Sequence, residues 1–293
     1  MKNVIKLLSF VVALILSCLS VVGCAESGKY DYYVIENASY GEYGERNLYD
    51  AAFPKGVEKA PIVLFIHGGG WTAGSKDGAV KGFVKNSADG YIYVALNYRY
   101  IGDGVTCYDI LDDITACLAS VKKDAEKLGV EVGKMMIYGY SAGGHLSLLY
   151  AYKAADESPF EVGMVASYSG ITDLNDENYY LNEKYLPTYL DWFSKLSGKS
   201  VTADNLSKAR DAFAAVSPIN YVSAAVPTII AHGENDDLVP LSNAVSLKHA
   251  LDFAGVENKL IVYADSGHGL ENDEHASARC EKLVEEFKEK YLK

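Results

Sequence analysis

The sequence has no internal repeat, no low-complexity tract and no Pro- or Gly-rich linker beyond the short stretch 25–29. These absences exclude a solenoid and a string of small tethered domains. Of the 293 residues, 49% are hydrophobic, which is enough apolar material for a sizeable core. We therefore expect one large domain.

Cysteine is also scarce. Beyond residue 24 the sequence has Cys107, Cys117 and Cys280, and their spacing matches no metal site, so we expect no metal. Cys107 and Cys117 could pair in an oxidising compartment. However, Cys117 lies on the apolar face of a predicted helix, which favours a buried free thiol.

Basic residues are few relative to acidic ones. Lys and Arg number 27 against 39 Asp and Glu, which gives a net charge of −12. A surface of this charge repels nucleic acid and anionic membranes. We therefore expect no nucleic-acid partner.

The first 23 residues have the pattern of an export signal. Lys2 and Lys6 precede an apolar run at 7–22, and Gly23-Cys24 follow. The ending resembles a bacterial lipobox, in which the cysteine becomes the lipidated first residue. We expect residues 1–23 to be a lipoprotein signal peptide, Cys24 to carry lipid and residues 24–29 to form a tether.

The chain would then be an exported cell-envelope lipoprotein that contacts the membrane only through its lipid. Removal of residues 1–23 would leave 25 basic and 39 acidic residues, a net charge of −14. The alternative is an ordinary cleaved signal, which would make the chain a secreted protein with Cys24 incidental.

Residues 30–293 alternate predicted strands with predicted helices. The unbroken apolar run 62–66 is typical of a strand that is covered on both faces of a parallel sheet. Similar runs occur at 91–96, 134–138, 162–167, 228–231 and 260–263, and an antiparallel strand pair is expected within 30–53. Helical patterns occur at 76–88, 110–128, 206–216, 243–253 and 274–292, and Gly129 is the expected stop of the second of these helices. The alternation predicts an α/β fold with a mostly parallel central sheet, helices on both faces and ligands at the carboxyl ends of the strands.

Residues 172–226 are too many for a plain connection. Aromatic residues are frequent here: Tyr179, Tyr180, Tyr185, Tyr189, Trp192 and Phe193. We expect a helical cap inserted over the ligand site. The alternative is an extra helical lobe whose aromatic residues are only core.

A serine between two glycines follows the predicted strand 134–138. The residues Gly139-Tyr140-Ser141-Ala142-Gly143 lead directly into a helical pattern, and small residues are needed where a strand turns sharply into a helix. Ser141 is the predicted nucleophile. A glycine-rich turn of this kind can also cradle a phosphate, so other motifs must decide.

Three consecutive glycines follow the predicted strand 62–66, in His67-Gly68-Gly69-Gly70-Trp71. Their backbone N–H groups can face a reacting oxygen, as can the N–H of the residue after the nucleophile. We assign the oxyanion hole to Gly69, Gly70 and Ala142, with Gly68 as the alternative to one of them. His67 is expected to tie the loop down.

An acid and a histidine follow the last two predicted strands. Asp236 is the predicted acid, with Asp237 and Glu234 as local alternatives, and His268 between two glycines is the predicted base. The order Ser141, Asp236, His268 is one of the known chain orders of a catalytic triad. Two other histidines are assigned to packing and two to exposed helix positions: His145, His232, His249 and His275.

Together with Asn97-Tyr98-Arg99-Tyr100, these motifs resemble the α/β-hydrolase superfamily. The similarity is to esterases and lipases with an HGGG-type oxyanion loop, near hormone-sensitive-lipase-like and feruloyl- or acetyl-esterase-like enzymes, and it runs from residue 61 to the C-terminus. It implies carboxylic ester hydrolysis by a Ser-His-Asp triad through an acyl-enzyme, without a metal or organic cofactor.

The resemblance is specific for the fold and weak for the substrate. We expect the substrates to be short acyl or aromatic esters, including acetyl or feruloyl groups linked to polysaccharide. Export and the aromatic side chains of segment 172–226 motivate the polysaccharide, because aromatic faces can stack on sugar rings. Three alternatives stay open. They are an arylformamidase, a peptidase on the same fold, and a catalytically silent ligand-binding lipoprotein. The first is included because an HGG-x-W loop together with this serine motif also resembles kynurenine formamidases.

Overall fold

The computed structural model describes residues 30–293. The predicted signal peptide 1–23, the predicted lipidation of Cys24 and the predicted tether 24–29 lie outside the described residues. None of the helices within 30–293 has the length and apolar character needed to cross a membrane.

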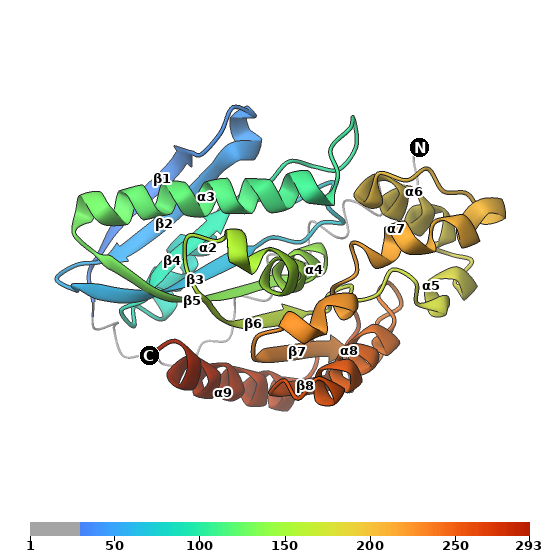
Figure 1. Cartoon of the computed structure of the whole chain (residues 1–293). Helices are drawn as coiled ribbons and strands as arrows, with labels where there is room; N and C mark the ends of the chain where they lie inside the picture. Colours follow the sequence, from blue (N-terminus) through green and yellow to red (C-terminus); the bar gives the residue numbers. More distant parts are fainter. Residues whose placement is uncertain (1–29) are drawn as a thin grey trace.

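One eight-stranded sheet forms the centre of the molecule (Figure 1), in the order β1-β2-β4-β3-β5-β6-β7-β8. The strands are β1 (Tyr32–Ser39), β2 (Leu48–Pro54), β3 (Lys59–Ile66), β4 (Ile92–Leu96), β5 (Glu131–Tyr140), β6 (Val162–Tyr168), β7 (Thr228–Gly233) and β8 (Asn258–Tyr263). β2 pairs antiparallel with β1 and with β4, and every other neighbouring pair is parallel. The predicted mostly parallel sheet is confirmed.

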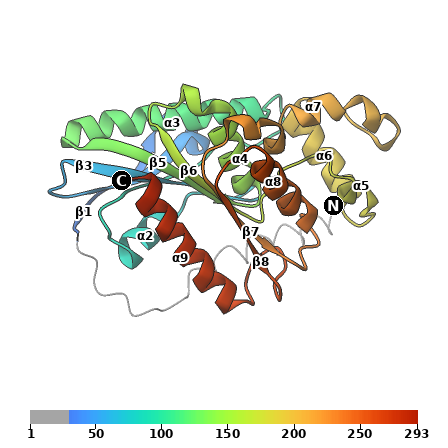
Figure 2. The same cartoon turned by 60° about the horizontal axis from the view of Figure 1, so that its bottom comes forward.

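Helices cover both faces of this sheet (Figure 2). The helices outside 172–226 are α2 (Ala79–Asn86), α3 (Cys107–Leu128), α4 (Ala142–Leu149), α8 (Leu241–Phe253) and α9 (Glu274–Tyr291). Along β3, Ile62 and Leu64 belong to the core that α3, α4 and α8 cover, while Val63 belongs to the core under α2 and α9. Because successive side chains of a strand point to opposite faces, two covered faces produce the unbroken apolar run.

Helix α3 shows how local residues set the ends of an element. It begins at a capping box in which Asp109 accepts hydrogen bonds from the Thr106 backbone N–H and hydroxyl, each at 2.8 Å. It ends at Gly129, whose φ of 72° is left-handed, as its predicted role of stop residue requires. The apolar periodicity alone starts at Ile110 and therefore missed the first turn.

The cysteines of the described residues are free thiols. Cys107, Cys117 and Cys280 are all buried and unpaired, so the pairing of Cys107 with Cys117 does not occur in this structure. Burial raises the pKa of Cys107 to about 12 and also raises that of Cys117. The thiols are therefore packing groups.

The segment 172–226 is a set of short helices at one end of the sheet (Figure 1). It contains α5 (Glu177–Leu181), α6 (Leu186–Ser197) and α7 (Arg210–Ala214), with the 3-10 turns Ala203–Lys208 and Pro218–Ala224. The helical pattern at 206–216 is divided between a 3-10 turn and α7, because a capping box of Thr202 and Asn205 starts the 3-10 turn earlier in the chain. Tyr179, Tyr189 and Phe193 pack edge-to-face or stacked on one another, so these aromatic residues do form a core.

Candidate active site

Ser141 stands at the junction of β5 and α4 in a strained backbone conformation. Its φ of 55° and ψ of −120° lie in a region that residues other than glycine rarely adopt. The turn is fixed by hydrogen bonds from the Ser141 N–H to the Tyr168 carbonyl at 2.8 Å and from the His145 N–H to the Ser141 carbonyl at 3.0 Å. This is the geometry expected of a nucleophile elbow.

The glycines beside Ser141 are required by close backbone contacts. A Cβ on Gly143 would lie 2.1 Å from the Ile66 carbonyl oxygen, and a Cβ on Gly139 would lie 2.5 Å from the same oxygen and from the Gly143 carbonyl. Any side chain at either position would therefore push α4 away from β3. The sequence pattern around Ser141 reflects this contact.

The oxyanion loop, which we define as residues 67–74, runs past the elbow from the end of β3. Gly69 and Gly70 have φ of 111° and 59°, and neither N–H donates a hydrogen bond among the described residues. The N–H of Ala142 is the first of helix α4, a position that leaves the N–H without a partner inside the helix. Gly68 packs against the elbow, because its Cβ would lie 2.7 Å from the Tyr140 carbonyl oxygen.

The predicted acid and base are joined directly. His268 Nδ1 lies 2.8 Å from Asp236 Oδ2, and the other carboxylate oxygen accepts hydrogen bonds from the Leu238 and Val239 N–H groups at 3.0 and 2.8 Å. Burial by itself would raise the pKa of Asp236, but the His268 charge and hydrogen bonds from His232 and His268 outweigh it and hold that pKa below its usual range. Asp236 is therefore a buried, ionised partner for His268.

The two alternative acids lie elsewhere. Asp237 and Glu234 are both exposed, and Asp237 Oδ2 pairs with Lys184 Nζ at 2.7 Å. Neither bonds to His268 within residues 30–293, so of these three carboxylates only Asp236 contacts this histidine.

The base and the nucleophile are not bonded in this structure. Within residues 30–293 no hydrogen bond joins the Ser141 side chain to His268, whose side chain is 24% exposed. Such contacts are often long in unliganded hydrolases and tighten when substrate binds. The roles of Ser141, His268 and the oxyanion donors therefore stay predictions.

Two buried histidines hold the oxyanion loop in place. His145 Nδ1 accepts a hydrogen bond from the Trp71 indole at 3.3 Å, and its Nε2 donates to the Val216 carbonyl at 2.8 Å. Burial lowers the pKa of His145 to about 4 and that of His67 to about 3, so both rings are neutral. Neutral, fully buried rings with fixed partners serve packing, as the sequence predicted.

Arg46 was not found from the sequence. Its side chain reaches three backbone or ring acceptors around the oxyanion loop: the Tyr98 carbonyl at 3.0 Å, His67 Nε2 at 3.2 Å and the Gly74 carbonyl at 3.4 Å. It also lies over the Tyr100 ring, 3.9 Å from its centre. Arg46 therefore clamps both ends of the loop, and no sequence motif marks it.

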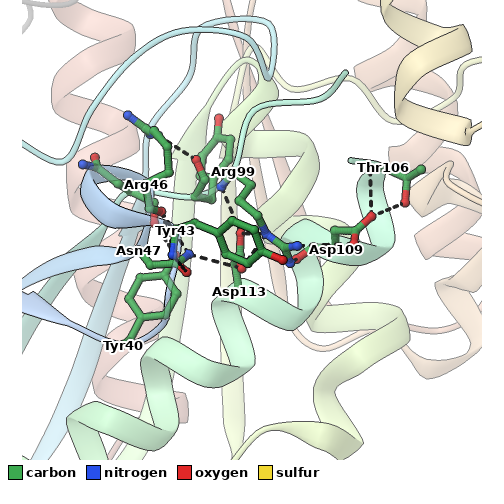
Figure 3. Close-up of polar contacts among 10 residues, drawn as sticks. Tyr40, Tyr43, Arg46, Asn47, Arg99, Thr106, Asp109 and Asp113 are labelled. Atoms are coloured by element: carbon green, nitrogen blue, oxygen red, sulfur yellow. Dashed lines mark hydrogen bonds and ion pairs between the residues drawn. The ribbon is translucent and has the colours of Figure 1, made fainter. Parts of the chain in front are cut away.

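Arg99 anchors the neighbouring segment to α3 (Figure 3). Its Nε lies 2.9 Å from Asp113 Oδ2, and its guanidinium covers the Tyr43 ring at 4.4 Å. The Asn97-Tyr98-Arg99-Tyr100 motif thus supports the loop, since the Tyr98 and Tyr100 hydroxyls also bond to the carbonyls of its two ends, His67 and Gly74.

A small pocket opens beside Ser141. Its other walls come from the oxyanion loop, from segment 172–226 with the preceding Ile171, and from the residues that follow Asp236: Gly70, Trp71, Ile171, Tyr179, Tyr189, Trp192, Phe193, Leu238 and Val239. The volume is ≈ 10 Å³, about the least that admits one water molecule. Trp192 closes it from α6, since a Cβ on Gly70 would lie 2.6 Å from the Trp192 ring.

A larger hollow of ≈ 330 Å³ lies at Lys199, Ser200, Asn205, Lys208 and Ala209. It contains no group of the triad and is not a candidate for the same chemistry. Among residues 30–293 no cluster of three His, Cys, Asp or Glu side chains could hold a metal ion.

Comparison with known proteins identifies the family of this chain. The model of the BD-FAE family matches residues 49–251, more than half of the chain. The chain belongs to the BD-FAE family. One similar protein is the probable carboxylic ester hydrolase LipM of Mycobacterium tuberculosis. The two sequences are 32% identical over 248 residues, which cover 80% of this chain and 55% of LipM. This chain spans about half the length of the curated relatives it matches.

Solved structures extend the comparison to the fold of this BD-FAE chain. A truncated carbohydrate esterase from gut microbiota superposes with a TM-score of 0.67 at 19% identity, over 90% of this chain and 99% of that one. Esterase B from Lactobacillus rhamnosis gives 0.70 at 18% identity, over 98% and 94%. Together with the family match, they confirm the predicted α/β-hydrolase fold and its place near the hormone-sensitive-lipase-like esterases.

Proposed function

We propose that this BD-FAE-family chain hydrolyses carboxylic esters through an acyl-enzyme. The observation that carries the proposal is the 2.8 Å bond between His268 and the ionised, buried Asp236, at the strand edge that also holds the strained Ser141. Two similar proteins of Mycobacterium tuberculosis, named a probable carboxylic ester hydrolase (LipM) and an esterase (LipQ), support the proposal.

In the proposed reaction Ser141 Oγ attacks the ester carbonyl while His268 Nε2 takes its proton. The Gly69, Gly70 and Ala142 N–H groups stabilise the oxyanion. His268 then returns the proton to the leaving alcohol. His268 next deprotonates a water molecule that attacks the acyl carbonyl, and passes this proton to the leaving Ser141 Oγ as the acid is released. Asp236 holds the imidazole with Nδ1–H toward itself and stabilises its cation throughout.

The proposed substrates are esters of short acyl or aromatic acids, with acetyl or feruloyl groups on polysaccharide among them. The narrow aromatic pocket supports a small or flat acyl group. A larger group requires Trp192 to move, because its ring covers Gly70.

Hydrolysis of p-nitrophenyl acetate tests the general proposal. We expect turnover by the wild type, a loss of several orders of magnitude in Ser141→Ala, and no loss in Ser223→Ala, an exposed serine that serves as the matched control. Turnover that survives in Ser141→Ala would refute the assignment. A panel of esters with increasing acyl length and with aromatic acids then defines the substrate.

Other substrates and a covalent probe distinguish the alternative functions. Faster hydrolysis of N-formylkynurenine or of a proline anilide than of any ester would favour an arylformamidase or a peptidase. A fluorophosphonate probe that fails to label Ser141 would favour a silent binding protein.

Export as a lipoprotein is also proposed, from the pattern at residues 1–24. Metabolic labelling with palmitate should mark the full-length chain and not the Cys24→Ala variant. Equal labelling of both would contradict lipidation at Cys24.

A further inference from the structure

Tyr179 is the feature of the pocket that the proposed chemistry leaves unexplained. The residue is fully buried in α5, and its ring packs edge-to-face on Tyr189 and Phe193, with ring centres 4.8 and 5.2 Å apart. Its hydroxyl has no hydrogen-bond partner among the described residues, although the residue lines the pocket beside Ser141.

The neighbouring phenols are different. Tyr189 donates to the Leu238 carbonyl at 2.8 Å, and Tyr180 donates to the Leu174 carbonyl. A buried hydroxyl without a partner loses its hydration and gains nothing in return, so a phenylalanine would be more stable at position 179. A buried hydroxyl without a protein partner costs stability, and an acceptor atom of a bound ester can recover that cost.

The hydroxyl is a donor under all working conditions. Burial first, and then the nearby Tyr189, Asp176 and Asp236, raise the pKa of Tyr179 well above its usual value. The neutral phenol therefore keeps a proton to donate, and an acceptor atom of a bound molecule can take that hydrogen bond.

We propose that Tyr179 is a specificity residue that donates a hydrogen bond to an acceptor atom of the bound ester other than the reacting carbonyl. The protein would then prefer esters with an ether or hydroxyl oxygen near the ester group over alkyl esters of the same shape. This inference rests on the proposed ester hydrolysis. A site that offers a buried donor discriminates strongly against the analogue that lacks the acceptor, because the donor is then left unpaired.

The acceptor can belong to the acyl part or to the alcohol part of the ester, and two isosteric pairs distinguish them. p-Nitrophenyl methoxyacetate and p-nitrophenyl butyrate differ on the acyl side by one oxygen in place of a methylene. 2-Methoxyethyl acetate and butyl acetate differ in the same way on the alcohol side. For each pair, kcat/KM is measured in the wild type and in Tyr179→Phe, and the ratio of ratios cancels the intrinsic reactivity of the esters.

We expect Tyr179→Phe to reduce the preference for the ether ester by about tenfold or more in one pair, which also identifies the side of the ester that occupies the pocket. Tyr189→Phe is the matched control, because it removes a phenol hydroxyl from the same pocket that is bonded to the protein. It should leave both ratios near the wild-type values and lower the melting temperature, whereas Tyr179→Phe should keep or raise it.

Ratios that do not change in either pair, in an active enzyme, would overturn the role of Tyr179 and leave ester hydrolysis intact. A melting temperature that falls as much in Tyr179→Phe as in Tyr189→Phe would show a structural role and overturn it as well. If the wild type hydrolyses none of the four esters nor p-nitrophenyl acetate, the proposed function fails, and the inference fails with it.

Discussion

Replacement of Asp236 by Asn gives the most direct test of the site. Asp236 Oδ1 accepts the Leu238 and Val239 N–H groups, and an amide oxygen can keep both bonds. The amide NH2 then takes the place of Oδ2, 2.8 Å from His268 Nδ1. Because the amide donates where the carboxylate accepted, His268 must turn its Nδ1 lone pair toward it and carry its proton on Nε2, which can no longer take the proton of Ser141.

The expected loss in kcat is about 10⁴-fold, as for a triad with the wrong histidine tautomer, or about 5.5 kcal/mol of transition-state stabilisation. Steady-state hydrolysis of p-nitrophenyl acetate measures it, with circular dichroism to verify folding. Asp237→Asn is the control, since among residues 30–293 that exposed carboxylate pairs with Lys184 and Tyr185 of segment 172–226, and the variant should keep nearly full activity. A loss below tenfold in Asp236→Asn, or an equal loss in both variants, would refute the assigned acid.

The same variant tests the electrostatics of the fold. The pKa of Asp236 is lowered in the folded chain, so its charge stabilises the fold above the pKa of an unfolded Asp, about 3.9, and this contribution fades as the pH falls below that value. The melting temperature of the wild type should therefore exceed that of Asp236→Asn at pH 6, and the gap should narrow toward pH 3. A gap that widens on acidification would contradict the lowered pKa.

Three further variants test the parts around the triad. Gly143→Ala should destabilise the fold by roughly 2–4 kcal/mol in urea unfolding, because its Cβ would lie 2.1 Å from a β3 carbonyl oxygen, while Gly133→Ala meets nothing closer than 3.4 Å. Arg46→Gln should lower kcat by about 10–100-fold with a smaller change in KM, since the oxyanion loop loses its clamp, whereas the exposed Arg279→Gln should not. Trp192→Ala should raise kcat/KM for longer acyl esters relative to acetate, because it removes the ring over the oxyanion loop.

Three results would contradict these expectations. Equal stability of the two glycine variants would show that α4 can move away from β3 at no cost. A rise in KM alone would place Arg46 in substrate binding and not in support of the loop. An unchanged acyl-length profile would mean that Trp192 does not limit the pocket.

Most strands and helices of the fold, and the local motifs of the proposed site, could be predicted from the sequence. Strands that are covered on both faces must be apolar at every position, so β3, β4, β5, β6 and β7 were found from unbroken runs. The turn at Ser141 needs glycines because α4 touches β3 there, and this need appears in the sequence as a local pattern. Such features are local consequences of backbone geometry, and that is why they could be predicted.

Tertiary structure decided which groups meet. Three carboxylates follow β7 within four residues, and only the fold turns Asp236 inward to His268 and leaves Asp237 to Lys184. Arg46 and Tyr179 belong to segments far from the triad in the chain, and their roles depend on contacts across more than twenty residues of sequence. A sequence pattern reflects the local requirements of the backbone, because these involve residues that are neighbours in the chain. Contacts between distant segments cannot be predicted in this way, because they form only when the strands pair and the helices pack on the sheet.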